Sequence, residues 1–429
     1  MRKSQTLIER CSEILKNNLP DQRVLELLPY RYTCPAREKS VYLPQWLWDS
    51  CFHALAYRWF DPGMAWEELQ SLVRYQVDEG PDSGMIPHMA YLRENKALAA
   101  QKLFGRRDRS TITQPPLVSV AAALVHKKAP DKSRLAKLYP KLRAYHEWFD
   151  RRRDDDQDNL AAIIHPWESG WDASQRWDAP MGRRPRGIEE LRLLEDKRKE
   201  LLTVCADHGY DAGVLAKVPG AFYAEPVDFN AIRAADLLAL AEIAEELRET
   251  AEREELQARA RAVQEAVREK MIAWEDERPQ AFDLIGHEEL KSPVDHAGKF
   301  VLLFGKCLSD TEAETFSAQL FDPSGPYETS YKIASTARTD PSFDPAEYWR
   351  GNVWLPLNWL VWRGLRAYGQ KTQAGAIVRD SLALIEKSGF CEFFNPLTGE
   401  SGSKYGQSCP QRQSWSTIVL DMVQESADE

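Results

Sequence analysis

The sequence predicts an all-α fold, a closed toroid of helical hairpins known as the (α/α)6 barrel. Apolar residues recur with the period of an α-helix through most of the 429 residues, whereas strand-like runs such as Ala281–Ile285 are few and short. Short links and longer irregular segments alternate between the helices, as expected for successive hairpins. An open superhelix of hairpins would show a repeat of about 34–45 residues, and the sequence has none. We therefore expect one barrel domain over residues 1–429.

The expected helices follow one another along the whole chain. They cover residues 4–18, 47–59, 64–78, 115–127, 132–152, 187–206, 228–248, 250–275, 309–321, 352–369, 371–388 and 411–425. Asp131 and Ser309 stand at N-cap positions, and Gly369 and Gly389 stand where two C-terminal helices should stop. The stretch from about 187 to 277 is highly charged. Its apolar positions do not keep a strict heptad, which favours long solvated helices over a coiled coil.

The composition excludes several classes of protein. Hydrophobic residues make up 43% of the chain and aromatic residues 10%, which is too apolar for a disordered chain. The 66 acidic residues outnumber the 56 basic ones, the net charge is −10, and the sequence has no basic arm. Because nucleic-acid binding needs clustered Lys and Arg, nucleic acid is not an expected partner.

The sequence also indicates a cytoplasmic protein. Residues 1–20 have charged or polar side chains every few positions and so lack the apolar core of a signal peptide. No stretch approaches the roughly eighteen apolar residues of a membrane span. The seven cysteines never form a CxxC pair, which is typical of free thiols in a reducing compartment. We expect no membrane association, and a homo-oligomer is compatible with the sequence.

Chemistry is concentrated in segments that mix aromatic and polar residues. They are YLPQWLWDSCFH (42–53), SGMIPHMAY (83–91), HPWESGWDASQRWD (165–178), EYWRGNVW (347–354) and CEFFNPLTGESG (391–402). These segments hold half of the 14 tryptophans. Aromatic faces stack on the C–H surfaces of sugar rings, while carboxylates and amides bind their hydroxyl groups. Any single Trp is more often part of a core, but the clustering favours a sugar-binding cleft.

Two carboxylates stand out because aromatic residues surround them. Asp172 follows Trp171, and Glu392 precedes Phe393. Desolvation by such neighbours raises the pKa of a carboxyl group, as an acid catalyst requires, and two facing carboxyl groups are the pair that glycoside hydrolysis needs. Glu168 either contacts the sugar, orients Asp172, or is satisfied by backbone amides. The metal-binding patterns HExxH, HxH and DxDxDG do not occur, so we expect no metal and no cofactor.

At these residues the chain resembles glycoside hydrolase family 63, the inverting α-glycosidases built on an (α/α)6 barrel. It is most similar to the compact bacterial branch that hydrolyses glucosylglycerate and mannosylglycerate. The similarity extends from about residue 30 to the end. The motifs that carry it are WLWDSCFH, HPWESGWDASQRWD, YWRGNVW and EFFNPLTGE followed by SWS.

The resemblance implies a role for individual positions. The general acid falls on Asp172 and the general base on Glu392. The sugar-pocket positions are Tyr42, Trp46, Trp48, Asp49, Gln114, Trp167, Tyr348, Trp349 and Trp354. The positions implied for the glycerate are Tyr91, Lys217, Tyr223 and Gln407. Lys217 replaces an arginine of the family, so it would meet a carboxylate without the bidentate geometry of a guanidinium.

The resemblance therefore implies single-displacement hydrolysis of a small anionic α-glycoside, with glucosylglycerate or mannosylglycerate as the substrate. Three alternatives stay open. A hydrolase of a neutral α-disaccharide would keep both carboxylates but needs no cation near the leaving group. Sugar epimerases also use α/α barrels but abstract protons with paired histidines. A non-catalytic sugar-binding protein would keep the tryptophans and lose a carboxylate.

Overall fold

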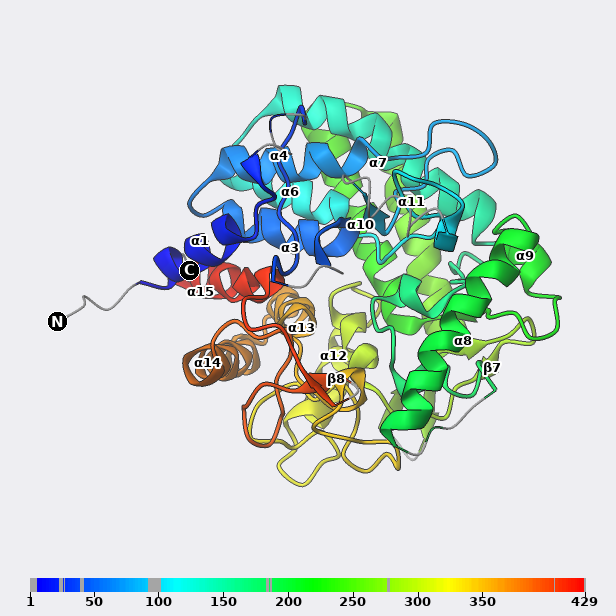
Figure 1. Cartoon of the computed structure of the whole chain (residues 1–429), viewed down its shortest axis with the longest axis vertical. Coiled ribbons are helices and arrows are strands. Elements are labelled where there is room, and N and C mark those ends of the chain that lie inside the picture. Colours follow the sequence, from blue (N-terminus) through cyan, green and yellow to red (C-terminus); the bar gives the residue numbers. More distant parts are fainter. Residues whose placement is uncertain are drawn as a thin grey trace.

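The computed structural model describes residues 6–22, 26, 28–38, 42–91, 102–182, 185, 187–275, 278–404 and 406–427 (Figure 1). The α-helices are α1 (Leu7–Asn17), α3 (Leu47–Tyr57), α4 (Pro62–Val73), α6 (Val118–Lys128), α7 (Lys132–Arg152), α8 (Ile188–Asp207), α9 (Ala212–Leu215), α10 (Val227–Leu247), α11 (Thr250–Ala266), α12 (Asp310–Phe321), α13 (Leu355–Ala367), α14 (Lys371–Ser388) and α15 (Val419–Ala427). The 3₁₀ and π turns are η2 (Pro166–Ser169), η3 (Gln175–Trp177), η4 (Val267–Met271), η5 (Ala297–Leu303), η6 (Tyr348–Arg350) and η7 (Ser414–Ile418).

The strands are short and form small antiparallel pairs at the edges of the helices. They are β1 (Gln45–Trp46), β2 (Met89–Ala90), β3 (Ala224–Glu225), β4 (Ile272–Glu275), β5 (Arg278–Ala281), β6 (Leu284–Ile285), β7 (Leu290–Lys291), β8 (Ser403–Lys404) and β9 (Gln407–Ser408). β1 pairs with β2, β6 lies between β3 and β7, β4 pairs with β5, and β8 pairs with β9. These pairs connect loops, while the helices form the body of the fold.

Among the described residues, six buried elements follow one another around a closed ring. They are α3, α6, α10, η5, α13 and η7, and η7 returns to contact α3. Every residue of α3 and η5 is buried, because inner elements contact neighbours on all sides. Figure 1 shows α15, which continues η7, beside α1 and α3, so the two ends of the chain meet where the ring closes.

A second layer of helices covers the outside of this ring. α1, α4, α7, α11, α12 and α14 each contact an inner element. These helices are amphipathic; in α11 the buried residues Leu256, Ala260, Val263 and Ala266 recur at the spacing of one helical face. Outer and inner elements alternate along the chain, as six successive hairpins require. This arrangement confirms the predicted (α/α)6 barrel.

The predicted helices agree with the observed ones to within a few residues at most ends. Helix α7 (132–152) and helix α14 (371–388) have the predicted bounds. The prediction of a helix through 275 is wrong, because α11 ends at Ala266 and the chain enters β4, which pairs with β5. The short inner element η5 was not predicted. Residues 4 and 5 of the first predicted helix lie outside the described part of the chain, as do residues 276 and 277 of the highly charged stretch.

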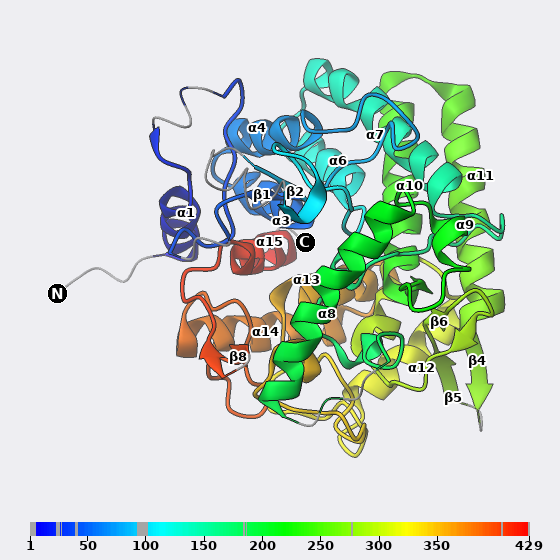
Figure 2. The ribbon, with the colours of Figure 1, turned by 45° about the vertical axis from the view of Figure 1, so that its right-hand side comes forward.

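The highly charged stretch is not uniformly solvated. Helix α10 belongs to the inner ring, where Arg233 donates to Asp150 and Asp236 contacts His146. The prediction of solvated helices is wrong for α10, because most of its residues are buried inside the ring. Helix α8 is an insertion with mixed charges, and in Figure 2 it runs diagonally across the front of the barrel.

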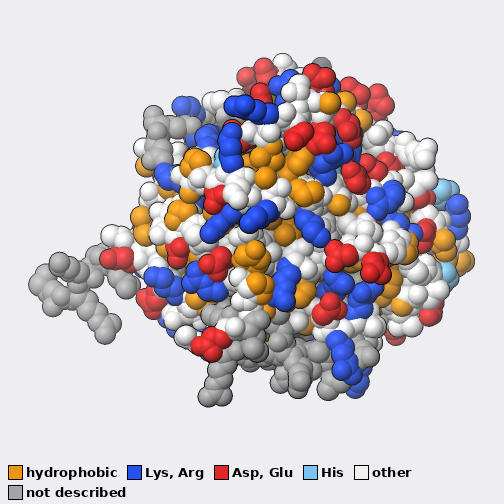
Figure 3. All heavy atoms as spheres, turned by 90° about the horizontal axis from the view of Figure 1, so that it is seen from above, with side chains coloured by type: hydrophobic (Ala, Val, Ile, Leu, Met, Phe, Trp, Pro, Cys, Tyr) orange, Lys and Arg blue, Asp and Glu red, His pale blue; other side chains and the backbone are white. Residues whose placement is uncertain are grey.

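The surface combines both signs of charge. On the face drawn in Figure 3, Lys and Arg side chains alternate with Asp and Glu side chains and with apolar atoms. Of the helices in the described part of the chain, none is both long enough and apolar enough to span a lipid bilayer.

Candidate active site

A cavity of about 640 Å³ lies where the loops at one end of the barrel converge. It brings together segments that are far apart in the sequence, and helix α8 and the β8–β9 hairpin form part of its wall. Of the predicted site residues, the cavity is lined by Tyr42, Trp46, Trp48, Asp49, Tyr91, Gln114, Trp167, Asp172, Tyr348, Glu392 and Gln407. A lining rich in aromatic rings with a few convergent polar groups is typical of small-ligand sites.

The start of α3 and the loop before it form one side of the cavity. β1 pairs with β2, which places Trp46 opposite Met89. Asp49 lies in the first turn of α3, where a carboxylate is favoured by the helix dipole. Gly170 lies against Trp48, and a Cβ at this glycine would stand 2.5 Å from the indole. Any larger residue at position 170 would therefore displace the Trp48 ring.

Tyr348 lines the cavity from η6 with a left-handed backbone conformation, φ +29°. Such conformations are uncommon for residues other than glycine and concentrate at functional sites. Trp349 and Trp354 do not line the cavity. Their rings stack in parallel at 3.7 Å between centroids, and Trp354 also packs against Tyr348. The two predicted pocket residues thus act from behind the wall, where they fix the position of Tyr348.

Glu392 is buried at the bottom of the cavity, with an exposed fraction of 3%. The Tyr42 hydroxyl donates a hydrogen bond to its Oε1 atom at 2.8 Å. Its backbone is held on both sides, since its amide donates to the carbonyl of Pro410 and its carbonyl accepts from Trp415 Nε1. The carboxylate is therefore oriented before any ligand arrives.

Asp172 follows the η2 turn, and its surroundings separate its role from that of Glu168. Glu168 is fully buried and accepts hydrogen bonds from the amides of Thr113 and Ile164 and from Arg153. Of the alternatives open for Glu168, satisfaction by backbone amides is the one observed. Asp172 instead lines the cavity. His88 lines the cavity, whereas His165 packs behind Trp167. Burial lowers the pKa of His88 to about 3, so its ring is neutral.

Asp172 and Glu392, the two carboxyl groups expected to do the chemistry, both have raised pKa values. Burial raises the pKa of Asp172 to about 6 and that of Glu392 to about 8, while the Lys404 ammonium opposes both shifts. The negative charge of Asp172 also raises the pKa of Glu392. Two interacting carboxyl groups titrate as a pair rather than one by one. Between about pH 6 and pH 8 the pair therefore holds a single proton. The higher pKa of Glu392 places this proton mainly on Glu392 before substrate binds, so the reactive arrangement, with the proton on Asp172 and Glu392 ionised, is the minor form of the singly protonated pair.

We expect a bell-shaped dependence of kcat/KM on pH with its maximum near pH 7. Below about pH 6 both carboxyls are protonated and the base is lost, and above about pH 8 both are ionised and the acid is lost. A pH series of initial rates measures both limbs. An activity that stays constant from pH 5 to pH 9 would contradict the assignment of these two groups.

The structure places neither Lys217 nor Tyr223 in the cavity. Lys217 is exposed just after α9. Tyr223 packs in a separate cluster with Leu215, and its hydroxyl donates to Asp155 Oδ1 at 2.8 Å. Neither of the two residues expected to contact glycerate therefore belongs to the cavity wall, because Lys217 is exposed at the surface and Tyr223 is held in its own cluster.

Basic residues that were not predicted occupy the cavity wall instead. Arg192 and Lys199 line it from α8, together with Glu195, and Lys404 lines it from β8. The Lys404 ammonium stands 4.1 Å from the centre of the Tyr348 ring. The three residues of α8 are spaced by three and four positions and so share one helix face. That spacing was visible in the sequence, but the direction of the face depends on how α8 docks.

The cavity and its carboxyl pair lie within a segment that matches a known family. The "Mannosylglycerate hydrolase MGH1-like glycoside hydrolase domain" family matches residues 42–416, which include every lining residue named above. The chain belongs to this family. It is a glycoside hydrolase.

Two relatives and one solved structure illustrate the similarity. A mannosylglycerate hydrolase of Thermus thermophilus is 36% identical, over 88% of this chain and 94% of the relative. The glucosylglycerate hydrolase of Mycolicibacterium hassiacum is 27% identical, over 89% and 92%. The crystal structure of a GH63 mannosylglycerate hydrolase, also from Thermus thermophilus, in complex with Tris and D-glycerate superposes with a TM-score of 0.81 at 30% identity, covering 98% of this chain and 100% of that one.

Proposed function

We propose that this glycoside hydrolase cleaves glucosylglycerate or mannosylglycerate to the free sugar and glycerate, with inversion at the anomeric carbon. The observation that carries the proposal is one cavity in which two carboxyl groups, half-buried Asp172 and buried Glu392, share a wall with basic side chains. The names of the relatives, mannosylglycerate hydrolase and glucosylglycerate hydrolase, support the same class of substrate.

In the proposed mechanism the two carboxyl groups act on opposite faces of the sugar. Protonated Asp172 donates to the glycosidic oxygen while Glu392 removes a proton from the attacking water. Because the Tyr42 hydroxyl donates to Glu392 Oε1, the proposed acceptor of the water proton is the other oxygen, Oε2. Such a pair needs about 6.5–9.5 Å between carboxyl groups to accommodate the water. One displacement converts an α-glycoside into a β-sugar.

The sugar subsite is assigned to the aromatic side of the cavity. Trp48 and Trp167 offer ring faces for the C–H surface of the pyranose, while Asp49 and Gln114 can bind hydroxyl groups. Trp46 Nε1 is buried and has no hydrogen-bond partner among the described residues. A buried donor of this kind is stabilised when a ligand hydroxyl accepts from it.

The leaving-group subsite is assigned to the basic side. Lys404, Lys199 and Arg192 can attract the glycerate carboxylate, and the neighbouring Gln407 can bind its hydroxyl group. A neutral disaccharide would gain nothing from these charges. The basic wall therefore favours the anionic substrate over the neutral α-disaccharide.

A time course followed by proton NMR tests the proposal with glucosylglycerate, mannosylglycerate and a neutral α-glucobiose side by side. We expect the β-anomer of the sugar to appear first, and only from the anionic substrates at an appreciable rate. First appearance of the α-anomer would overturn the single displacement. Preference for the neutral disaccharide would retain the carboxyl pair and overturn the anionic leaving group.

The Lys404→Gln variant isolates the leaving-group subsite. We expect kcat/KM for the anionic glycoside to fall about tenfold, the effect of losing roughly one charge-assisted contact, while slow hydrolysis of a neutral α-glycosyl fluoride changes less. Lys137→Gln, an exposed lysine on α7, is the matched control. Equal losses for both substrates in Lys404→Gln would contradict a role in recognising the anion.

A further inference from the structure

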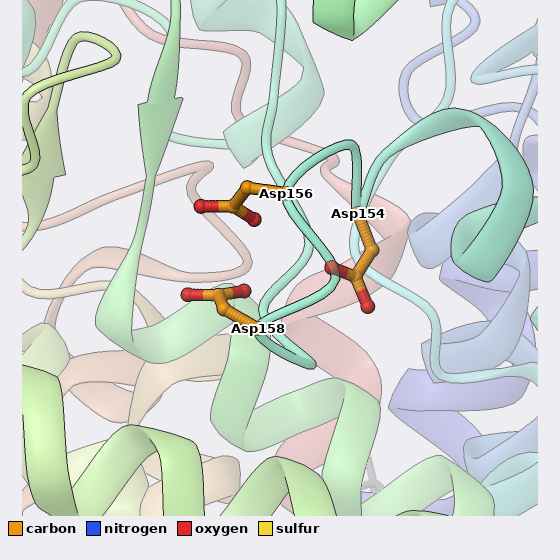
Figure 4. A group of neighbouring side chains, drawn as sticks. All are labelled: Asp154, Asp156 and Asp158. Atoms are coloured by element: carbon orange, nitrogen blue, oxygen red, sulfur yellow. The ribbon is translucent and has the colours of Figure 1, made fainter.

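A second group of carboxylates lies away from the active-site cavity, in the loop that follows α7. Asp154, Asp156 and Asp158 alternate along this loop, and one oxygen of each lies within 4.8 Å of the others. Figure 4 shows the carboxylates of Asp156 and Asp158 extending from the same side of the loop. Asp158 belongs to a second triad with Glu225 of β3 and Glu289, whose oxygens also lie within 4.8 Å of one another. Three separate segments of the chain thus point carboxylates at one place.

The basic groups near this cluster leave several carboxylate oxygens unsatisfied. Lys270 Nζ donates to Asp158 at 2.5 Å and to Glu289 at 2.7 Å. Glu225 has an exposed fraction of 1%, and no described residue forms a hydrogen bond with its Oε2 atom. Asp154 Oδ1 is likewise buried and without a hydrogen-bond partner in the described structure. Buried carboxylate oxygens without partners are costly, so one ammonium group does not account for the cluster.

We propose that this cluster binds one divalent cation of the Ca²⁺ type. Ca²⁺ is bound by six to eight oxygens at about 2.3–2.6 Å, so two ligand oxygens around one ion are at most about 5 Å apart. The separations in both triads fit that limit. Mg²⁺ is less suitable because it demands near-ideal octahedral geometry and retains its water. The buried Glu225 oxygen supplies the second, independent reason to place a cation here.

The sequence of this loop differs from the usual calcium-loop pattern, so the pattern does not match it. Asp154, Asp156 and Asp158 have the spacing of its first three ligands, but Asn159 stands where that pattern has glycine. Asn159 adopts φ +73°, the left-handed conformation for which glycine is otherwise used and which asparagine tolerates. The remaining carboxylates come from β3 and from the β6–β7 turn, which no local pattern can reveal.

The position of the site gives the cation a structural role. It would join the loop after α7 to β3, which bridges to Ile163 and pairs with β6. The chain continues from Ile163 through η2 to Asp172. A cation here would stabilise the segment that carries the proposed acid while taking no part in the reaction. The inference is independent of the substrate assigned above.

Calorimetric titration of CaCl2 into chelator-treated full-length protein tests the proposal. We expect about one Ca²⁺ per chain with a Kd below about 100 μM, and a rise of several degrees in unfolding temperature at millimolar CaCl2, because a ligand that binds only the folded state stabilises it. MgCl2 and NaCl at matched ionic strength should give smaller shifts. No binding and no thermal shift up to 10 mM CaCl2 would mean that Lys270 alone serves the cluster, and would overturn the proposal.

Variants locate the binding. Glu225→Gln should weaken Ca²⁺ binding at least tenfold, and Asp156→Asn, which changes an exposed residue and so preserves folding, should do the same. In the chelated protein Asp156→Asn should be no less stable than the parent, because it removes a charge that Asp154 and Asp158 repel. Glu314→Gln, an exposed carboxylate on α12, is the matched control. Parent-like Ca²⁺ affinity in Asp156→Asn and in any folded Glu225→Gln would place the ion elsewhere and overturn the site.

Discussion

Replacing Asp172 with asparagine is expected to lower kcat/KM for the glycosyl glycerate about 10²- to 10⁴-fold, the usual contribution of a general acid. The amide has nearly the same shape but cannot protonate the glycosidic oxygen. Substrate binding should change little, because the aromatic walls and the basic residues remain in place. Steady-state kinetics measures the effect, once thermal unfolding has shown that the variant is as stable as the parent.

The leaving group provides the decisive comparison for Asp172→Asn. A glycosyl fluoride departs without protonation, so its hydrolysis should fall far less than that of the natural glycoside. The alkaline limb of the pH profile should disappear as well, because Asp172 no longer titrates. Asp207→Asn, an exposed carboxylate at the end of α8, serves as the control. Full retention of glycoside hydrolysis in Asp172→Asn would refute the acid assignment.

Replacing Glu392 with glutamine should lower kcat/KM by a factor similar to that expected for Asp172→Asn. Here the loss should be the same for the glycoside and for the fluoride. Water then lacks the group that removes its proton, whatever the leaving group. The Tyr42 hydrogen bond can pass to the amide oxygen, so the geometry should persist. Glu400→Gln, an exposed neighbour in the same loop, is the matched control.

Added azide distinguishes loss of the base from loss of structure in Glu392→Gln. Azide attacks without giving up a proton, so it should restore turnover of the fluoride and form a β-glycosyl azide that NMR identifies. An α-glycosyl azide would indicate a double displacement instead. Absence of any rescue in a correctly folded variant that still binds substrate would leave Glu392 without the role proposed for it.

The barrel explains why these carboxyl groups behave unlike surface ones. Residues of α3, η2, η6 and η7 meet in the cavity, where aromatic side chains exclude water. The Trp349–Trp354 stack fills the space behind the wall. Desolvation raises the pKa of both Asp172 and Glu392, and the positive charge of Lys404 opposes both shifts.

Much of this protein was predictable from local sequence. Helical periodicity is set by neighbours three and four residues apart, which is why α7 and α14 have the predicted bounds. The aromatic and carboxylate segments are also local, and they correctly indicated a cavity lined by Asp172 and Glu392. Trp349 and Trp354 were placed in the right region, although they support the wall rather than line it.

Contacts between distant segments could not be predicted in this way. The Tyr42–Glu392 hydrogen bond joins residues 350 positions apart. The basic wall of the cavity likewise combines Arg192 and Lys199 of α8 with Lys404 of β8, about two hundred positions later, and it includes neither Lys217 nor Tyr223. Sequence pattern indicates which residues share a helix face but not what that face meets. The sequence by itself indicated which side chains could do the chemistry. Their hydrogen-bond partners, their burial and hence their pKa values depend on contacts between distant segments, which only the tertiary structure determines.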